Sequence, residues 1–186
     1  MSVKPVYIKI FLGEKEPKFD KVAKSDSRIK IYDGLPIFSD LMEDIRSYRA
    51  QPGLVVFDDL ANDLSTSGVD YLNLLQRGGS HNNLSTVLVS QTLFCSRKNN
   101  ILRQFSLQSH YTWLFKSKRD LLAIGHLSRQ ILGPSRANLM VECYRRATSE
   151  PYDFLLIRTH PRDADQIMFV KGSSIFDKSP VVVYSI

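Results

Sequence analysis

The segment LVVFDD, residues 54–59, places four apolar side chains directly before two carboxylates. A short, uniformly apolar run predicts a strand that is buried within a sheet, and the two acids predict that this strand ends abruptly at solvent. Similar apolar runs alternate with polar, helix-capable stretches on both sides of the segment. That alternation is typical of βαβ units, so the sequence predicts an α/β fold with a mostly parallel sheet and flanking helices.

The individual elements can be placed from their apolar spacing and from nearby Gly and Pro residues. Strands are predicted at residues 6–12, 28–32, 54–57, 86–90 and 111–115. Helices are predicted at residues 37–49, 67–76, 120–132 and 139–147. No predicted helix separates the last three strands, which indicates antiparallel pairing at residues 154–158, 166–170 and 181–184. The strand at residues 86–90 is uniformly apolar at its centre and is expected to be fully buried.

The composition agrees with one globular domain over residues 1–186. Hydrophobic residues make up 43% of the chain and charged residues 24%, which suits a folded protein with a core. No apolar run approaches the ~18 to 20 residues of a membrane span, and no secretory signal is visible, so we expect an intracellular protein without a membrane partner. Cys95 and Cys143 lack CxxC spacing, which favours reduced, packed thiols over a disulfide framework or a zinc site.

Charge is distributed unevenly along the chain. There are 25 Lys and Arg residues against 19 Asp and Glu, and residues 95–162 alone hold 12 bases and 4 acids. Such a segment would attract a polyanion by neutralising phosphates and releasing counterions. The alternative is a basic face that is simply solvated.

The two aspartates after the apolar run have the form of a Walker B segment. A hard cation such as Mg²⁺ prefers carboxylate and water oxygens, so Asp58 is the candidate metal ligand, acting through water. Asp59 beside it could accept a proton from an attacking water as general base. The alternative is an Asp-rich turn that caps the following helix.

Two further polar sites accompany this segment. Gln91 follows the strand at residues 86–90, and the carboxyl ends of neighbouring parallel strands share one edge of the sheet, so Gln91 is expected beside the aspartates. Its amide could sense the γ-phosphate of a nucleotide, although a turn residue at the end of a strand is the simpler explanation. Arg77 lies in the Gly-rich loop QRGGSHNN, residues 76–83, which could contact a neighbouring subunit and supply an arginine in trans.

Beyond these residues, most of the chain resembles one protein family. The similar segments are GLP at 34–36, LVVFDDL at 54–60, RGGSHNNLSTVLVSQTLF at 77–94, SHYTWLFKSKRD at 109–120, SRQILG at 128–133 and PYDFLLI at 151–157. They resemble the genome-packaging ATPases of poxvirus and Maverick/Polinton type, which belong to the FtsK/HerA superfamily of P-loop motors. The resemblance implies an additional-strand, RecA-like P-loop NTPase core that uses ATP and Mg²⁺.

The same resemblance implies partners and a cellular setting. It implies an oligomeric ring that translocates double-stranded DNA, with full-length packaging ATPase subunits or a viral capsid as further partners. The expected location is the host nucleus, a viral assembly site or the virion. Asp58, Asp59 and Gln91 fall at the Walker B and sensor positions of the family, and Arg77 falls in the loop that faces the next subunit.

One motif of the family does not occur in the sequence. A P-loop needs GxxxxGK followed by Ser or Thr, and none of the nine glycines is followed by Lys. By resemblance, the missing piece includes a central strand between the Walker B and sensor strands, whose loss would leave both strands unpaired unless they pair directly. ATP hydrolysis by these residues alone is not expected. The missing piece could be encoded separately, the gene could be a decayed viral copy, or the protein could be a non-catalytic derivative that binds DNA or other subunits.

Two basic clusters follow predicted strands and are the candidate DNA contacts, with contact to another subunit as the alternative. Their members are Arg97, Lys98, Arg103, Lys116, Lys118 and Arg119. Aromatic residues adjoin both clusters and are expected to lie in the core, as strand aromatics usually do. These are Phe94, Phe105, Trp113 and Phe115.

Overall fold

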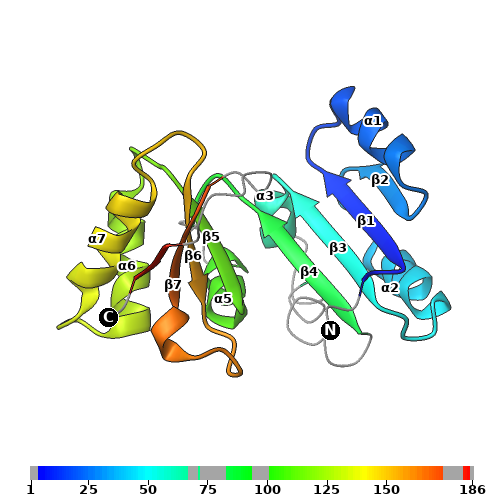
Figure 1. Ribbon diagram of the computed structural model, residues 1–186. Coiled ribbons are helices and arrows are strands. Elements are labelled where there is room, and N and C mark those ends of the chain that lie inside the picture. Colours follow the sequence, from blue (N-terminus) through cyan, green and yellow to red (C-terminus); the bar gives the residue numbers. More distant parts are fainter. Residues whose placement is uncertain (1–3, 67–70, 72–82, 94–100, 174–181, 185–186) are drawn as a thin grey trace. The chain divides into compact units, whose positions relative to one another are not determined.

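The computed structural model describes residues 4–66, 71, 83–93, 101–173 and 182–184 (Figure 1). The chain forms two compact units, Met1–Phe105 and Ser106–Ile186. Within the described residues, the fold is α/β, with a parallel sheet in the first unit and an antiparallel sheet in the second. None of the helices in these ranges is both long enough and apolar enough to cross a membrane.

The first unit is built on a four-stranded parallel sheet with the order β2-β1-β3-β4. Its strands are β1 (Tyr7–Leu12), β2 (Ile29–Asp33), β3 (Gly53–Asp58) and β4 (Leu84–Val89). Its helices are α1 (Lys18–Ser25), α2 (Phe38–Ser47) and α3 (Ala61–Thr66). All four strands and α2 were predicted, whereas α1 and α3 were not. The helix predicted at residues 67–76 falls almost entirely outside the described residues.

The strand pairing tests two predictions about this sheet. β3 pairs directly with β4 from Gly53 opposite Leu84 to Asp58 opposite Val89, so no strand lies between them and their facing backbone groups are paired. Of the two outcomes expected for a missing central strand, direct pairing is therefore the one observed. The expectation that β4 is fully buried is wrong, because β4 lies at the edge of the sheet formed by the described strands and Val89 is 47% exposed.

One face of the parallel sheet carries the core of the first unit. Aromatic and aliphatic side chains of the strands pack there against α2 and α3. The central members of this cluster are Tyr7, Phe11, Leu41, Ile45, Val55, Phe57, Leu60 and Leu64. The opposite face presents aliphatic side chains that are only half-buried, namely Ile8, Ile10, Ile29, Ile31, Leu54, Val56 and Val87.

A buried lysine lies within the core of the first unit. Lys9 of β1 is 1% exposed, and its ammonium forms an ion pair with Asp44 of α2. The same Nζ atom lies 5.8 Å from the ring centroid of Tyr7, 5.7 Å from that of Tyr32 and 5.4 Å from that of Tyr48. Ring faces attract a cation, and the effect is stronger away from water. The carboxylate and the three rings together make burial of the charge tolerable, and they tie α2 to the sheet.

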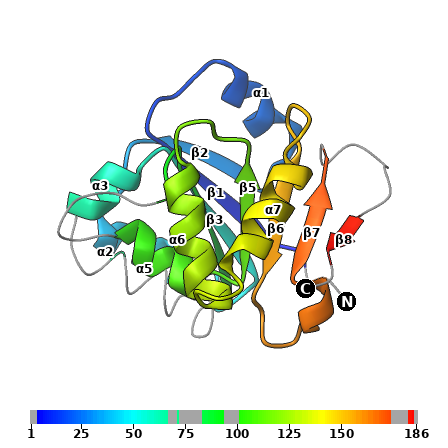
Figure 2. The same cartoon turned by 90° about the vertical axis from the view of Figure 1, so that its left-hand side faces the viewer.

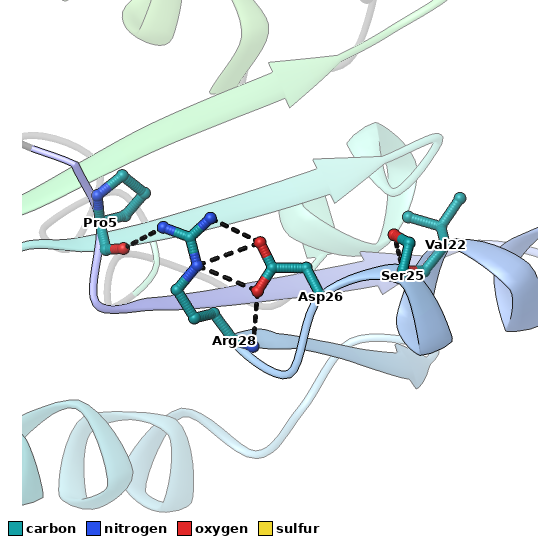
Figure 3. Close-up of polar contacts among 5 residues, drawn as sticks. All are labelled: Pro5, Val22, Ser25, Asp26 and Arg28. Atoms are coloured by element: carbon teal, nitrogen blue, oxygen red, sulfur yellow. Dashed lines mark hydrogen bonds and ion pairs between the residues drawn. The ribbon is translucent and has the colours of Figure 1, made fainter.

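A second polar contact fixes the start of β2 beside the start of β1 (Figure 3). The Arg28 guanidinium donates to both carboxylate oxygens of Asp26, and its Nη1 donates to the carbonyl of Pro5 at 2.9 Å. Hydrogen bonds from Arg28 lower the pKa of Asp26 to about 2. The turn after α1 is thereby attached to the segment that enters β1.

The second unit is an antiparallel sheet with the order β5-β6-β7-β8. Its strands are β5 (Tyr111–Phe115), β6 (Phe154–Arg158), β7 (Phe169–Gly172) and β8 (Val182–Tyr184). The predicted antiparallel ending is confirmed. A strand predicted at residues 166–170 instead begins at Phe169, after the short 3-10 helix η1 (Asp165–Ile167). β5 was expected in the mostly parallel sheet and is here an antiparallel edge strand.

Two predicted helices, α6 (Leu121–Leu132) and α7 (Ala137–Ala147), lie side by side over one face of this second sheet (Figure 2). An unpredicted helix, α5 (Ile101–Gln108), spans the division between the units. The sheet residues covered by these helices are buried, namely Leu114, Leu155, Ile157 and Phe169. Met140 and Cys143 of α7 are buried as well. Cys143 is a free, buried thiol, as expected, whereas Cys95 lies outside the described residues.

The prediction that strand aromatics lie in the core is wrong for β5. Trp113 is 49% exposed and Phe115 is 57% exposed. Side chains alternate along a strand, and Leu114 between these two takes the side covered by helices. Phe105 is half-buried, and Phe94 lies outside the described residues.

The contribution of the Lys9–Asp44 ion pair to stability can be tested by replacing each partner in turn. Asp44→Ala leaves a buried ammonium without its carboxylate and should lower the free energy of unfolding by about 2–4 kcal/mol. Lys9→Met should cost less, because Asp44 is 43% exposed and water can solvate it. Urea unfolding followed by tyrosine near-UV circular dichroism measures both.

Arg146→Met in α7 is the control, since the Arg146–Glu142 pair is exposed and should be worth less than about 1 kcal/mol. Equal losses for Asp44→Ala and Arg146→Met would contradict the stabilising role given to the buried pair.

Candidate functional site

A cleft of about 270 Å³ lies at the carboxyl edge of the parallel sheet. It collects residues that follow β1, β3 and β4, since parallel strands end on the same side. Its lining consists of Gly13, Glu14, Glu16, Phe19, Asp58, Asp59, Val89, Ser90 and Gln91. The predicted convergence of Asp58, Asp59 and Gln91 is thus observed.

Backbone hydrogen bonds from the neighbouring strands hold the two aspartates in place. The N–H of Gly13 donates to the Asp58 carbonyl at 2.9 Å, and the N–H of Asp59 donates to the Val89 carbonyl at 3.2 Å. A Cβ atom on Gly13 would lie 2.8 Å from the Asp59 carbonyl oxygen, so this position has no room for a larger residue. The close approach of Gly13 lets the loop after β1 seal one side of the cleft.

Asp59 adopts a backbone conformation that is uncommon for a residue with a side chain. Its φ angle is 56°, in the left-handed region, where Asp is tolerated better than most residues. This conformation breaks the extended path of β3 and buries Leu60 on the other side of the turn. The Asp59 carboxylate remains exposed at the mouth of the cleft.

Gln91 contacts Asp59 across the edge of the sheet. Its Nε2 donates to Asp59 Oδ2 at 3.3 Å, and Asp59 is an exposed residue. Ser90, which precedes it, donates its hydroxyl to the Thr92 carbonyl at 2.9 Å and so stabilises the local turn. Gln91 can therefore orient Asp59, while Ser90 has a structural contact.

The cleft is acidic. Burial, and then repulsion from the neighbouring Asp59 carboxylate, raise the pKa of Asp58 above its ordinary value. Glu16 raises the pKa of Asp58 further, and Lys18, which forms an ion pair with Glu16 at 2.7 Å, opposes the rise. An anion would be repelled here unless a cation accompanied it.

The donor set bears on the expected Mg²⁺ ion. In the part of the chain that the structure describes, no three His, Cys, Asp or Glu side chains converge as a complete metal cage. Mg²⁺ commonly uses one or two carboxylates and takes its remaining ligands from water and substrate phosphates. The adjacent Asp58 and Asp59 fit that mode, in which phosphate oxygens would be needed to complete the site.

The other predicted site residues that the structure describes are not in this cleft. Arg77, Arg97 and Lys98 lie outside the described residues. Lys116, Lys118 and Arg119 are exposed after β5, in the second unit, where Lys116 Nζ donates to the Ser149 carbonyl at 2.8 Å. The first unit also contributes members that sequence reasoning missed, namely Gly13, Glu14, Glu16 and Phe19. The available signal was a glycine and two acids directly after a predicted strand that is parallel to β3.

Gly13→Ala tests the close packing that shapes the cleft. The added methyl group would meet the Asp59 carbonyl, and moving that backbone should cost about 1–3 kcal/mol of stability. Thermal unfolding measures the loss, and Gly125→Ala on α6 is the control, because a Cβ there meets nothing within 4 Å. A Gly13→Ala protein as stable as wild type would contradict the described geometry.

Asp59→Asn tests the electrostatics. Removing the neighbouring negative charge should lower the pKa of Asp58, so its carboxyl group should titrate at a lower pH than in the wild type. Carboxyl ¹³C chemical shifts, followed against pH by NMR, give both midpoints. Glu43→Gln on the exposed side of α2 should leave the Asp58 midpoint unchanged.

Comparisons with known proteins assign no family to the chain. No family model, no curated protein and no solved structure matches the chain. The residues that any functional proposal must explain are therefore those that the sheet brings together: two adjacent carboxylates, an amide that contacts one of them and an acidic loop after β1.

Proposed function

We propose that this chain is the Walker B and sensor part of a motor that packages or translocates double-stranded DNA with energy from ATP. The observation that carries the proposal is the meeting of Asp58, Asp59 and Gln91 at the carboxyl edge of a parallel sheet. The resemblance of the sequence to packaging ATPases supplies the substrate class and the oligomeric ring. An uneven, basic charge over residues 95–162 supports a polyanionic partner.

In this proposal the two aspartates have different tasks. Asp58 is partly buried and would hold Mg²⁺, which supplies charge neutralisation for the phosphates when it is bound. Asp59 is exposed, so it can accept a proton from a water at the mouth of the cleft. Gln91 donates to one oxygen of this carboxylate and thereby links β4 to the position of the base.

The sequence contains no P-loop motif that would hold the phosphates. No Gly-Lys pair occurs in the sequence, and the described cleft is lined by four carboxylates and no base. Nucleotide phosphates need backbone N–H groups and a Lys charge, which residues outside these 186 would have to provide. We therefore expect these 186 residues alone to neither bind ATP tightly nor hydrolyse it.

A non-catalytic, ATPase-derived protein that binds DNA or other subunits is the second candidate. The direct pairing of β3 with β4 favours this candidate, because the two strands satisfy each other's backbone hydrogen bonds without a strand between them. The half-buried aliphatic face of the same sheet is also consistent with a subunit-binding role, since parallel sheets usually bury both faces.

Complementation in trans separates the two candidates. The purified chain is titrated with labelled ATP and Mg²⁺, alone and after mixing with a full-length packaging ATPase subunit whose own Walker B aspartates are inactivated. The motor proposal expects no binding by the chain alone and recovery of DNA-stimulated hydrolysis in the mixture. The non-catalytic candidate expects association without hydrolysis.

Variants of the chain show whether Asp59 acts as the base. Asp59→Asn should reduce the recovered turnover by about 10²- to 10⁴-fold, the usual contribution of general acid–base catalysis. Glu43→Gln, exposed on α2, is the matched control and should leave turnover unchanged. Full turnover with Asp59→Asn would remove the general-base assignment, and tight ATP binding by the chain alone would remove the argument from the missing P-loop.

A further inference from the structure

The antiparallel sheet of the second unit has one face with exposed aromatic rings. Tyr111, Trp113 and Phe115 alternate along β5 and are 41%, 49% and 57% exposed. Helices α6 and α7 cover the other face, where Leu114 is buried (Figure 2). Exposed aromatic side chains that share one strand face form a contiguous apolar strip, which is uncommon on a protein surface without a binding partner.

The three rings occupy alternate positions of β5, on one face of the strand. Tyr111 and Trp113 have ring centroids 6.4 Å apart, close to the ~6.8 Å that separates alternate residues of a strand. Phe115 at the other end of the row packs on Phe154 of β6, with centroids 5.5 Å apart. The row therefore offers successive flat surfaces rather than one compact hydrophobic knob.

The strands around the row contribute positive or neutral side chains, and the Asp163 carboxylate, after β6, contacts Tyr111 and Arg158 at one end of it. Arg158 of β6 is the register partner of Tyr111, and the ring of His160 stacks on that tyrosine with centroids 6.2 Å apart. At the Phe115 end the chain continues into Lys116, Lys118 and Arg119, all exposed. The register places no Asp or Glu from the described strands on this face. Its aromatic members are accompanied by Leu156, Val170, Gly172 and Val183.

Two of these basic residues have no acidic partner in the described part of the chain. Neither Lys118 nor Arg119 forms an ion pair with the described residues, so both remain available to phosphates. Arg158 differs, because it donates to both oxygens of Asp163 and that pair holds it at the edge of the row. Positive charge is thus most available at the Phe115 end.

We propose that this face of β5 binds single-stranded nucleic acid, with bases stacked on Tyr111, Trp113 and Phe115 and phosphates near Lys118 and Arg119. Aromatic platforms beside basic residues are the usual means of binding single strands, and four-stranded antiparallel sheets with helices on one face do so in RNA recognition. A duplex keeps its bases stacked within itself, so the rings would have no bases to contact. The proposal rests on the aromatic row of the second unit and on single strands, whereas the proposed motor function rests on the aspartates of the first unit and concerns double-stranded DNA; the basic residues after β5 bear on both.

The experiment uses the intrinsic fluorescence of the full chain. Trp113 is the only tryptophan in the sequence, so its emission reports directly on this face. Short oligothymidylate, oligouridylate and a DNA duplex of equal length are titrated separately, and anisotropy of a labelled copy of each gives the affinity. The expected result is quenching of Trp113 by both single strands, with weaker binding and no quenching by the duplex.

Variants then test the stacking and the charge separately. Trp113→Ala should weaken single-strand binding about tenfold, whereas Trp113→Phe should retain most of it because a ring remains. The double change Lys118→Ala with Arg119→Ala should reduce the salt dependence of binding, since fewer counterions are released. Leu122→Ala, an exposed apolar residue on α6, is the matched control and should change neither property.

Several results would overturn the proposal. One is single-strand binding that neither quenches Trp113 nor responds to Trp113→Ala, and another is duplex binding that is as tight and as ring-dependent as that of single strands. A third is self-association that Trp113→Ala abolishes while no oligonucleotide binds, which would assign the face to a second copy of the chain. In each case the outcome of the ATPase complementation is unaffected, so failure of one proposal can be told from failure of the other.

Discussion

The burial of Lys9 is the constraint on which the first unit depends most. An ammonium that is almost completely removed from water is tolerated only with a partner, and Asp44 together with three tyrosine rings supplies it. These groups come from β1, β2, α2 and the turn after α2, so the charge draws four segments to one place. Tyr48 also stacks on Tyr7 with ring centroids 3.9 Å apart, which closes the end of α2 over the sheet.

The position of β1 then determines the chemistry of the cleft. β1 pairs with both β2 and β3, so the loop after it arrives beside Asp58 and Asp59. Gly13 makes the contact possible by lacking a side chain, and the following acids make the cleft negative. An acidic edge of this kind suits a cation that arrives with phosphates better than a nucleotide alone, and this is what the proposed Walker B role requires.

The two units carry opposite surfaces. The described cleft of the first unit is lined by carboxylates, whereas the β5 face of the second unit combines exposed rings with nearby bases. The uneven charge of the sequence therefore corresponds to two different surfaces: an acidic cleft suited to cations and a basic, aromatic face suited to polyanions. Both proposals assign nucleic acid as a partner, but they assign it in different structural forms.

The sequence by itself determined the secondary structure of most elements and the convergence of Asp58, Asp59 and Gln91. Hydrophobic periodicity depends on local spacing, and parallel strands bring their carboxyl ends to one edge wherever they are paired. Only the tertiary structure decided which strands are neighbours: β3 with β4 without a gap, and β5 in an antiparallel sheet. It also decided that Lys9 is buried and that Trp113 is exposed, against the ordinary preference of each residue type. Burial depends on what packs against a residue from distant parts of the chain, and that information is absent from the local pattern.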